Sequence, residues 1–328
     1  MNILVTGGTG FLGQHLVKVL LTDGHTVRFM GRDFSQVQPL IAAGAIPIPA
    51  DLRNTSAVSQ ACNGVDVVYH VGALSAAWGK RADFFAINVG GTQAVIAGCR
   101  EYGIKRLIYV SSPSVVFNGQ DQHHVDESVP YPHPGRFASV YSLTKKLGED
   151  LVNACAPSLE TVIIRPKAIF GPSDRTLLPQ LIMAARRNRL PQVGKGNNLV
   201  DLTYVENVAY ALLLTLDARE AVGKTYTITN DEHISLWDVI RQILCKLGLS
   251  TNLRRVPLPL TLACATFMEV LASATGKEPL LTCYSATILA RTQTYNISAA
   301  KRDLGYVPQI SVAEGIERTL AALKGDGG

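Results

Sequence analysis

The sequence predicts an α/β fold, with a doubly wound parallel sheet followed by a smaller C-terminal lobe. Short apolar runs alternate with helical periodicity through the first 170 residues, which is the pattern of parallel strands joined by crossover helices. Beyond Gly171-Pro172 this alternation is lost, and loops rich in Gly and Pro separate the helical stretches. We therefore expect one domain over residues 1–170 and a second unit over residues 171–328.

The N-terminal segment MNILVTGGTGFLG organises the chain. Residues 2–5 form a mostly apolar run typical of a strand buried on both faces, and a helix is expected from about Gly13 to Leu21. Gly7, Gly10 and Gly13 keep the spacing G-x-x-G-x-x-G, which allows positive φ in the turn and a close approach of the backbone to a pyrophosphate. The free N–H groups at the start of the helix would bind the phosphates. This arrangement indicates a Rossmann dinucleotide site.

The second strand, expected at 25–30, ends in Gly31-Arg32. Enzymes that use NAD usually carry Asp or Glu at this point to bind the ribose 2′-hydroxyl, whereas a small residue followed by a guanidinium suits a 2′-phosphate. Asp33 lies close by and keeps NAD(H) as an alternative. We therefore expect NADP(H) to be the preferred cofactor.

Further strands are expected at 45–50, 65–70, 106–110 and 161–165, and prolines place the first of these near the sheet edge. Two strands end in Asp51-Leu52 and Val71-Gly72-Ala73, at the carboxyl ends where a parallel sheet builds its ligand crevice. A long helix is expected over 83–102. The C-terminal unit should hold helices at 177–189, 206–217 and 236–247 and a strand at 224–229. We interpret residues 1–170 as the dinucleotide-binding domain and residues 171–328 as mainly a substrate-binding lobe.

Composition argues against several classes of protein. The net charge of +5, from 31 basic and 26 acidic residues, forms no basic stripe, so we expect no nucleic-acid partner. Six cysteines lie far apart without a CxxC pair, which fits reduced thiols. The first strand begins at residue 2 and leaves no room for a signal peptide, so we expect a cytoplasmic protein without an integral membrane span. A homodimer and peripheral membrane contact stay open.

Tyr141 and Lys145 are four residues apart on a helix expected over 140–156, so their side chains lie on one face, a turn apart. A nearby ammonium would stabilise the phenolate and lower the phenol pKa from its ordinary value of about 10, so that Tyr141 could exchange a proton near neutral pH. A YxxxK pair alone is common. Ser111-Ser112 ends the strand at 106–110 and adds a hydroxyl that could bind a substrate oxygen.

With these motifs the sequence resembles the extended short-chain dehydrogenase/reductase superfamily over nearly its whole length. TGGTGFLG, YVSSPSVVF, YSLTK, RPKAIFGPSD and DLTYVENVA occur in the family's order and spacing. The resemblance implies that Tyr141 is the general acid/base, that Ser112 orients the carbonyl or hydroxyl, and that Lys145 tunes Tyr141 and binds the nicotinamide ribose. Ser111 is the alternative register for Ser112, and Asn88 would support the site's geometry. No metal is implied. The implied cofactor-binding residues are Gly7, Thr9, Gly10, Phe11, Leu12, Gly13, Arg32, Asp51, Leu52, Val71, Gly72, Ala73, Ser111, Tyr141, Lys145, Pro166, Ala168 and Ile169.

Within the superfamily, SSPSVVF, the AAWG around Trp78 and the ending DLGYVPQISVAEGI resemble the 3β-hydroxysteroid dehydrogenase branch, which includes bacterial β-keto acid reductases. This implies an oxidoreductase that interconverts a ketone and a secondary alcohol on a lipophilic substrate, such as a β-keto acid, a sterol-like compound or a natural-product intermediate.

Two alternatives are kept, one of the same fold and one from another class. Nucleotide-sugar epimerases and dehydratases share the triad, but they typically carry VYG where this chain has Val115-Val116-Phe117, and dehydratases carry Asp-Glu where it has Pro113-Ser114. A non-catalytic NADP(H)-binding sensor would need only the cofactor half, and not an intact Ser112, Tyr141 and Lys145.

An apolar stretch, a histidine pair and an arginine cluster lie outside these motifs. Residues 256–271 are the most apolar stretch and are interpreted as a buried or pocket-lining helix, with peripheral membrane contact or an opening for a lipophilic substrate as alternatives. His123-His124 lies between Asp121 and Asp126 but lacks the spacing of metal ligands, so no metal site is predicted. Arg186, Arg187 and Arg189 are interpreted as a solvated helix face rather than as an anion site.

Overall fold

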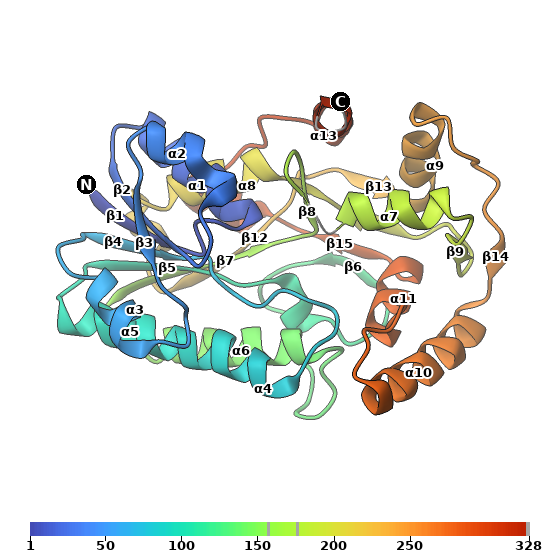
Figure 1. Ribbon diagram of the computed structural model, residues 1–328, viewed down its shortest axis with the longest axis horizontal. Coiled ribbons are helices and arrows are strands. Elements are labelled where there is room, and N and C mark those ends of the chain that lie inside the picture. The colour runs from blue at the N-terminus through green and yellow to red at the C-terminus, as the bar shows by residue number, and fades with distance from the viewer. Residues whose placement is uncertain (156–157, 175–176, 326–328) are drawn as a thin grey trace.

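A computed structural model describes residues 1–155, 158–174 and 177–325 of the chain. Seven parallel strands form a central sheet with helices on both faces, and a smaller lobe lies at one end of it (Figure 1). The strand order is β12-β7-β5-β4-β1-β2-β3. In sequence order these strands are β1 (Asn2–Thr6), β2 (Thr26–Gly31), β3 (Ile46–Pro49), β4 (Val67–His70), β5 (Arg106–Val110), β7 (Glu160–Pro166) and β12 (Lys224–Ile228).

The chain order along this sheet reverses between β1 and β4, which lie side by side with Ile3 opposite Val67. Ligands of doubly wound sheets bind at such a switch point, beyond the carboxyl ends of the strands. The predicted fold class is confirmed, and β3 is the edge strand that its prolines indicated.

Two cores cover the two faces of the sheet. In β1, Ile3 and Val5 face one core and Leu4 faces the other, as the two-residue period of a strand requires. The first core packs under α1 (Phe11–Thr22) and α8 (Val205–Leu214), which contact each other. The second packs under α3 (Thr55–Ala61), α5 (Gly91–Glu101) and α6 (Val140–Asn153). Small side chains on α5, among them Ala94 and Gly98, let it lie close to α3. A short helix, α2 (Gln38–Ala42), follows β2.

The smaller lobe is built around a second sheet, whose strand order is β13-β10-β15-β6. Two strand pairs and further helices complete the C-terminal half, in which the helix at 298–304 packs against β12 of the central sheet. The strands are β6 (Gln122–Val125), β8 (Ile169–Phe170), β9 (Gln192–Val193), β10 (Leu199–Asp201), β11 (Thr203–Tyr204), β13 (His233–Ser235), β14 (Arg255–Val256) and β15 (Gln293–Tyr295). The helices are α7 (Leu177–Arg186), α9 (Leu236–Lys246), α10 (Leu258–Thr275), α11 (Cys283–Ala290), α12 (Ser298–Leu304) and α13 (Val312–Gly325).

The chain passes between the two parts more often than the sequence pattern suggested. The strand expected at 224–229 is present as β12, but it pairs with β7 in the central sheet instead of belonging to the smaller lobe. Its buried Tyr226 and Ile228 join the first core, which explains that position. In return, β6 from the first half of the chain pairs with β15 in the smaller lobe. The boundary at residue 170 between a dinucleotide-binding domain and a substrate-binding lobe stays a prediction.

The helix predicted over 83–102 is interrupted. It consists of α4 (Arg81–Phe84), a π-helical turn η2 (Phe85–Gly90) and α5. Such wide turns inside helices are frequent at functional sites, and this one carries Asn88. The helix predicted over 140–156 is found as α6, and its expected last residue, Ala156, lies outside the described residues.

The apolar stretch at 256–271 is helical but not buried, so the favoured interpretation was wrong. Only Thr261, Ala265 and Ala272 of α10 are buried, whereas Phe267 and Val270 are 70% and 65% exposed. The helix is apolar all round and lies at the rim of the molecule against α11, so one narrow face can be covered (Figure 1). Within the part of the chain that the structure describes, α10 alone is long and apolar enough to cross a membrane. Its mean hydropathy over 18 residues is 1.4.

Candidate active site

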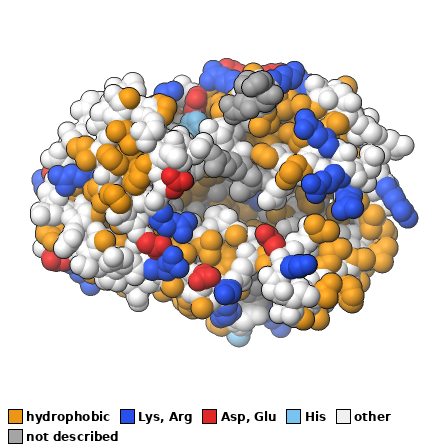
Figure 2. Space-filling view, in the orientation of Figure 1, with side chains coloured by type: hydrophobic (Ala, Val, Ile, Leu, Met, Phe, Trp, Pro, Cys, Tyr) orange, Lys and Arg blue, Asp and Glu red, His pale blue; other side chains and the backbone are white. Residues whose placement is uncertain are grey.

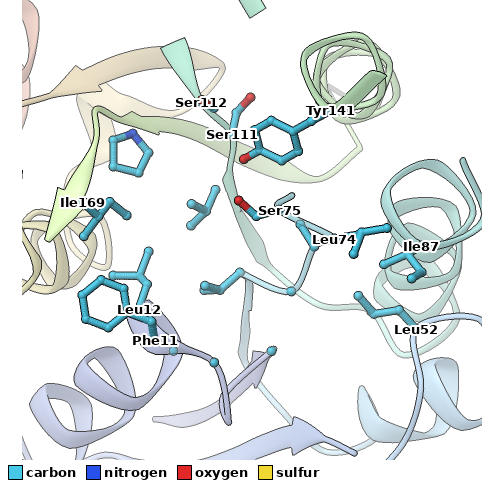
Figure 3. A pocket seen from close by; sticks show the side chains of 18 of the residues that line it. Phe11, Leu12, Leu52, Leu74, Ser75, Ile87, Ser111, Ser112, Tyr141 and Ile169 are labelled. Atoms are coloured by element: carbon cyan, nitrogen blue, oxygen red, sulfur yellow. The ribbon is translucent and has the colours of Figure 1, made fainter. Parts of the chain in front are cut away.

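A cavity of about 610 Å³ opens at the carboxyl ends of the central strands, between the sheet and the smaller lobe. Every predicted cofactor-binding residue except Lys145 lines it, and so does Ser112. Figure 3 shows that its walls come from the first helix, the strand ends and α6. Gly31, on which the NADP(H) prediction rests, also lines the cavity. The lining residues that we did not assign from the sequence are Met30, Ala50, Leu74, Ser75, Ile87, Val110, Pro113, Ser114, Lys167, Tyr284, Ile288 and Gln293.

The glycine turn fits a pyrophosphate. Gly7 has φ of +67°, and a Cβ there would lie 2.5 Å from the Cα of Gly72, so only glycine allows β1 and β4 to approach so closely. A Cβ at Gly13 would lie 2.2 Å from the carbonyl oxygen of Gly7, so the first turn of α1 packs directly on the loop. The N–H groups of that first turn have no partner within the helix, and they face the place where phosphates would bind.

The end of β2 has no room for an acidic side chain. A Cβ at Gly31 would lie 2.3 Å from the Cγ2 atom of Thr9. Arg32 follows on the rim of the cavity, with its side chain 73% exposed and its guanidinium 3.9 Å from the carboxylate of Asp51. Asp51 is bound more tightly by Arg53, and these hydrogen bonds lower the pKa of the Asp51 carboxyl to about 2. The Asp51–Arg53 ion pair and the exposed guanidinium of Arg32 therefore border this part of the crevice.

Asn88 joins the segment after β4 to α6. Its Oδ1 atom accepts a hydrogen bond from the backbone N–H of Leu74 at 2.7 Å, and its Nδ2 atom donates to Leu74 O and to the hydroxyl of Thr144. The π-helical turn brings this buried amide to the end of the strand. The bonds fit the supporting role that the family resemblance implied for Asn88, since they fix the wall that carries Leu74 and Ser75.

Tyr141 points into the cavity from the first turn of α6, and its hydroxyl lies near the serine hydroxyls in Figure 3. Burial raises the pKa of the Tyr141 phenol, while hydrogen bonding to Ser75 and Ser112 acts in the opposite direction. Of the two serines after β5, Ser112 is the one that affects the pKa of Tyr141, and both serines line the cavity.

Lys145 lies beneath the cavity wall rather than on it. Its side chain is 2% exposed, and its Nζ atom lies 3.9 Å from the centre of the Tyr109 ring, a cation–π contact. Burial lowers the pKa of the Lys145 ammonium to about 7, and Glu149 acts against this. The predicted lowering of the Tyr141 pKa by Lys145 is not found, because burial of the phenol dominates and the ammonium faces Tyr109.

A buried ion pair fixes α6 against the sheet. Arg165 on β7 donates two hydrogen bonds to the carboxylate of Glu149, at 2.8 and 2.6 Å, and both side chains are almost completely buried. The hydroxyl of Tyr131 donates to the same carboxylate at 2.7 Å and accepts from Arg165. Because Glu149 lies two turns after Tyr141, this network sets the position of the helix that carries the phenol.

The lining residues missed from the sequence arrive from distant parts of the chain. Tyr284 and Ile288 lie on α11 and Gln293 on β15, more than 140 residues after Tyr141, and no local pattern marks them. Burial raises the pKa of Tyr284 to about 12, with a further contribution from Tyr141. Ser75 could have been found by extending the strand ending that gave Val71 to Ala73. Lys167 was visible as a charged residue directly after a buried strand.

The other sequence candidates lie elsewhere. The ring of His124 lies edge-to-face against the ring of His233, whose Nδ1 atom is 2.6 Å from a carboxylate oxygen of Asp201. Across the described ranges, no three His, Cys, Asp or Glu side chains are placed to hold a metal ion. Arg186, Arg187 and Arg189 are exposed and do not line the large cavity, and Arg189 borders a second cavity of about 430 Å³.

A crevice of this kind, at the switch point of a doubly wound sheet and with a serine and a tyrosine in its wall, defines a Rossmann-fold protein of the dinucleotide-binding class. Residues 4–260 match the model of the 3-beta hydroxysteroid dehydrogenase/isomerase family, and the chain belongs to that family. It is an oxidoreductase that acts on CH–OH groups.

Relatives of known name agree with this assignment. The chain is 38% identical over 333 residues to the 2-alkyl-3-oxoalkanoate reductase of Stenotrophomonas maltophilia, a match that covers 98% of this chain and 99% of the relative. It is 36% identical to the decarboxylating sterol-4-alpha-carboxylate 3-dehydrogenase of Saccharomyces cerevisiae, covering 98% and 97% of the two chains. Among solved structures, the UDP-glucuronic acid 4-epimerase of Bacillus cereus in complex with NAD shares the fold, with a TM-score of 0.79, 24% identity and 99% coverage of both chains.

Proposed function

We propose that the protein is an NADP(H)-dependent ketoreductase that interconverts a ketone and a secondary alcohol on a lipophilic substrate. The observation that carries the proposal is the position of Tyr141, whose phenol lies in the same cavity as the glycine turn and within reach of Ser112. A bound nicotinamide would supply or accept the hydride. The glycine turn would hold its diphosphate, and Lys145 would act on the ribose, as the family resemblance implies.

The proton-transfer chemistry then falls to Tyr141. In reduction, the phenol gives its proton to the carbonyl oxygen while the hydroxyl of Ser112 orients that oxygen, and in oxidation the proton returns. The raised pKa of the buried phenol keeps it protonated at neutral pH in the free protein. This state suits reduction, in which the new hydroxyl must gain a proton.

The preference for NADP(H) rests on the end of β2. Gly31 excludes an acidic residue next to Thr9, and Arg32 is an exposed cation that can turn toward a 2′-phosphate. Asp51 is the competing anion, but Arg53 already binds it. NAD(H) stays the alternative.

Nucleotide-sugar chemistry is the second candidate, because epimerases share the fold. Such a substrate needs cations for its diphosphate beyond the glycine turn. Among the described lining residues the cations are Arg32 and Lys167, and the cluster at 186–189 lies outside the cavity. The relatives with the higher identities are instead named for ketone and carbinol substrates with a carboxylate on the adjacent carbon.

For location, we propose a cytoplasmic protein that touches a lipid surface through α10. The exposed side chains of Leu260, Phe267, Val270 and Leu271 form an apolar patch at the rim, over α10 in Figure 2. Arg254, Arg255 and Lys277 flank the helix and would favour anionic lipids. Because α10 packs on α11, which lines the cavity, this contact would bring a lipophilic substrate close to the site.

Replacing Tyr141 by Phe should lower kcat by about 10²–10⁴-fold, because a positioned proton donor is lost. NADPH affinity, measured by the fluorescence of the reduced nicotinamide, should stay within about twofold. Tyr102→Phe, at the far end of α5, is the control and should leave kcat unchanged. Undiminished turnover by the Tyr141 variant would reject the mechanism.

Replacing Arg32 by Ala should weaken NADPH by about tenfold or more and NADH much less, because a charge-assisted bond to the 2′-phosphate is worth about 1.5–3 kcal/mol. Isothermal titration of each cofactor measures both values. Arg219→Ala, an exposed arginine after α8, is the control. If the wild type binds both cofactors equally, the NADP(H) preference is wrong.

Vesicles that contain anionic phospholipid should sediment the wild-type protein and should sediment Phe267→Glu/Val270→Glu much less, since two charges would enter the apolar boundary. Val307→Glu introduces a charge at an exposed apolar residue outside α10 and should leave binding unchanged. Equal sedimentation of all three proteins would remove α10 from the proposal.

A further inference from the structure

Lys167 is a charged side chain of the cavity wall that the proposed chemistry does not use. It follows β7 directly, at the bend before β8, and lines the cavity together with Ser114, Tyr284 and Gln293. Its Nζ atom donates a hydrogen bond to Oε1 of Gln293 at 2.6 Å and lies 5.6 Å from the centre of the Tyr295 ring. The ammonium therefore sits where the strand ends of the large sheet meet the smaller lobe.

The protein offers this ammonium no carboxylate partner at close range. Among the described residues, no carboxylate oxygen lies within 4.0 Å of Nζ, and the bonded Gln293 is neutral. Asp201 acts on it only from a distance, and its own oxygens are already bound by His233 and by the backbone N–H of Tyr295. Burial lowers the pKa of Lys167 to about 8.

Lys167 is half-buried in the cavity wall, and an ammonium that is partly removed from water is stabilised by an anionic partner. An ammonium has three N–H donors, and Gln293 takes one of them. Charged groups in protein interiors are normally paired, and an unpaired one costs several kcal/mol. Lys167 lines a cavity, so the missing anion can come from the substrate rather than from the protein.

We propose that Lys167, held by Gln293, is the subsite for a substrate carboxylate, so that the enzyme acts on β-keto and β-hydroxy acids in preference to neutral ketones and alcohols. This rests on the proposed function. The carboxylate carbon of such an acid is two bonds from the reacting carbon, so one small molecule can reach both the Tyr141 wall and the Lys167 wall. Tyr284 lines the same cavity as Tyr141 and Lys167.

The redox step leaves the carboxylate unchanged. In the oxidation direction, Tyr141 first loses its phenol proton to solvent. The phenolate then takes the carbinol hydroxyl proton, and a bound NADP⁺ would accept the hydride from the carbinol carbon, which would yield a ketone and NADPH. Lys167 binds the neighbouring carboxylate throughout. It therefore contributes binding and orientation, and not proton transfer.

The test compares a 2-alkyl-3-hydroxyalkanoate with its methyl ester, which has the same carbinol and hydrocarbon body but no charge. We expect the wild-type enzyme with NADP⁺ to favour the acid in kcat/KM by about tenfold or more, as a hydrogen bond to a charged group contributes about 1.5–3 kcal/mol. In Lys167→Met this preference should disappear, mainly through KM. Lys167→Arg should keep it, and Lys105→Met, an exposed lysine before β5, should not change it.

A second variant, Gln293→Glu, tests the same subsite without removing Lys167. Gln293→Glu places a carboxylate against the Lys167 ammonium. This carboxylate should pair with the ammonium and repel the substrate carboxylate, so kcat/KM should fall for the acid and change much less for the ester. If Lys167→Met and Gln293→Glu keep the wild-type preference for the acid, or if the wild type prefers the ester, the subsite proposal is wrong.

The carboxylate subsite and the proposed reaction can be tested separately. Binding of the acid and the ester to the NADP⁺-loaded protein, measured by calorimetry, does not depend on turnover. Acid binding that Lys167→Met abolishes would support the subsite even if neither compound were oxidised, and in that case only the proposed reaction would fall. Equal binding of acid and ester by the wild type would overturn the subsite even if both were oxidised.

Discussion

The chemistry of the fold depends on one close backbone contact: the turn after β1 lies against the turn after β4, with Gly7 facing Gly72. These two strands are neighbours at the point where the strand order reverses, so their ends define the crevice. A side chain at Gly7 would collide with backbone atoms, which cannot move without separating the strands. The N–H of Gly72 also donates to the hydroxyl of Thr6, which bonds His70, so the same contact is tied into the buried polar network between β1, β4 and α5. Everything that lines the cavity is placed relative to this contact.

The charged side chains around the crevice differ in the partners that the protein gives them. Arg165 and Glu149 neutralise each other and hold α6 in place, so their charges are used for position. Lys145 has an aromatic face and a more distant carboxylate, which leaves it able to act on groups that enter the site. Among the described residues, Lys167 donates a hydrogen bond to the neutral amide of Gln293 and lies near the Tyr295 ring, so its charge is available to a molecule that occupies the cavity. The three cases differ in how much of the desolvation cost the protein itself offsets.

The sequence predicted the fold class and most of the crevice, because strand endings and the glycine spacing are local patterns. Asp51, Gly72 and Ser112 could be placed in one site from their positions after strands, and all three line the cavity. Tyr284 and Gln293 could not, since they reach the cavity through tertiary packing of the C-terminal lobe. The exposure of α10 was missed for a related reason: an apolar composition gives the length of a helix but not whether a neighbour covers it. The pKa of Tyr141 was assigned the wrong direction because spacing on a helix gives proximity to Lys145 but not the degree of burial.

The central claim is that the cavity transfers a hydride between a nicotinamide and a ketone carbon. The most direct measurement uses NADPH with deuterium at the reactive carbon of the nicotinamide, a freshly hydrolysed 2-alkyl-3-oxoalkanoate, and mass spectrometry of the alcohol product. The account predicts one deuterium on the carbinol carbon from the cofactor, transferred from one face of the ring only, and none there when the label is supplied by the solvent. A carbinol carbon labelled from the solvent, or label transfer only to a UDP- or dTDP-keto sugar in a parallel reaction, would contradict it.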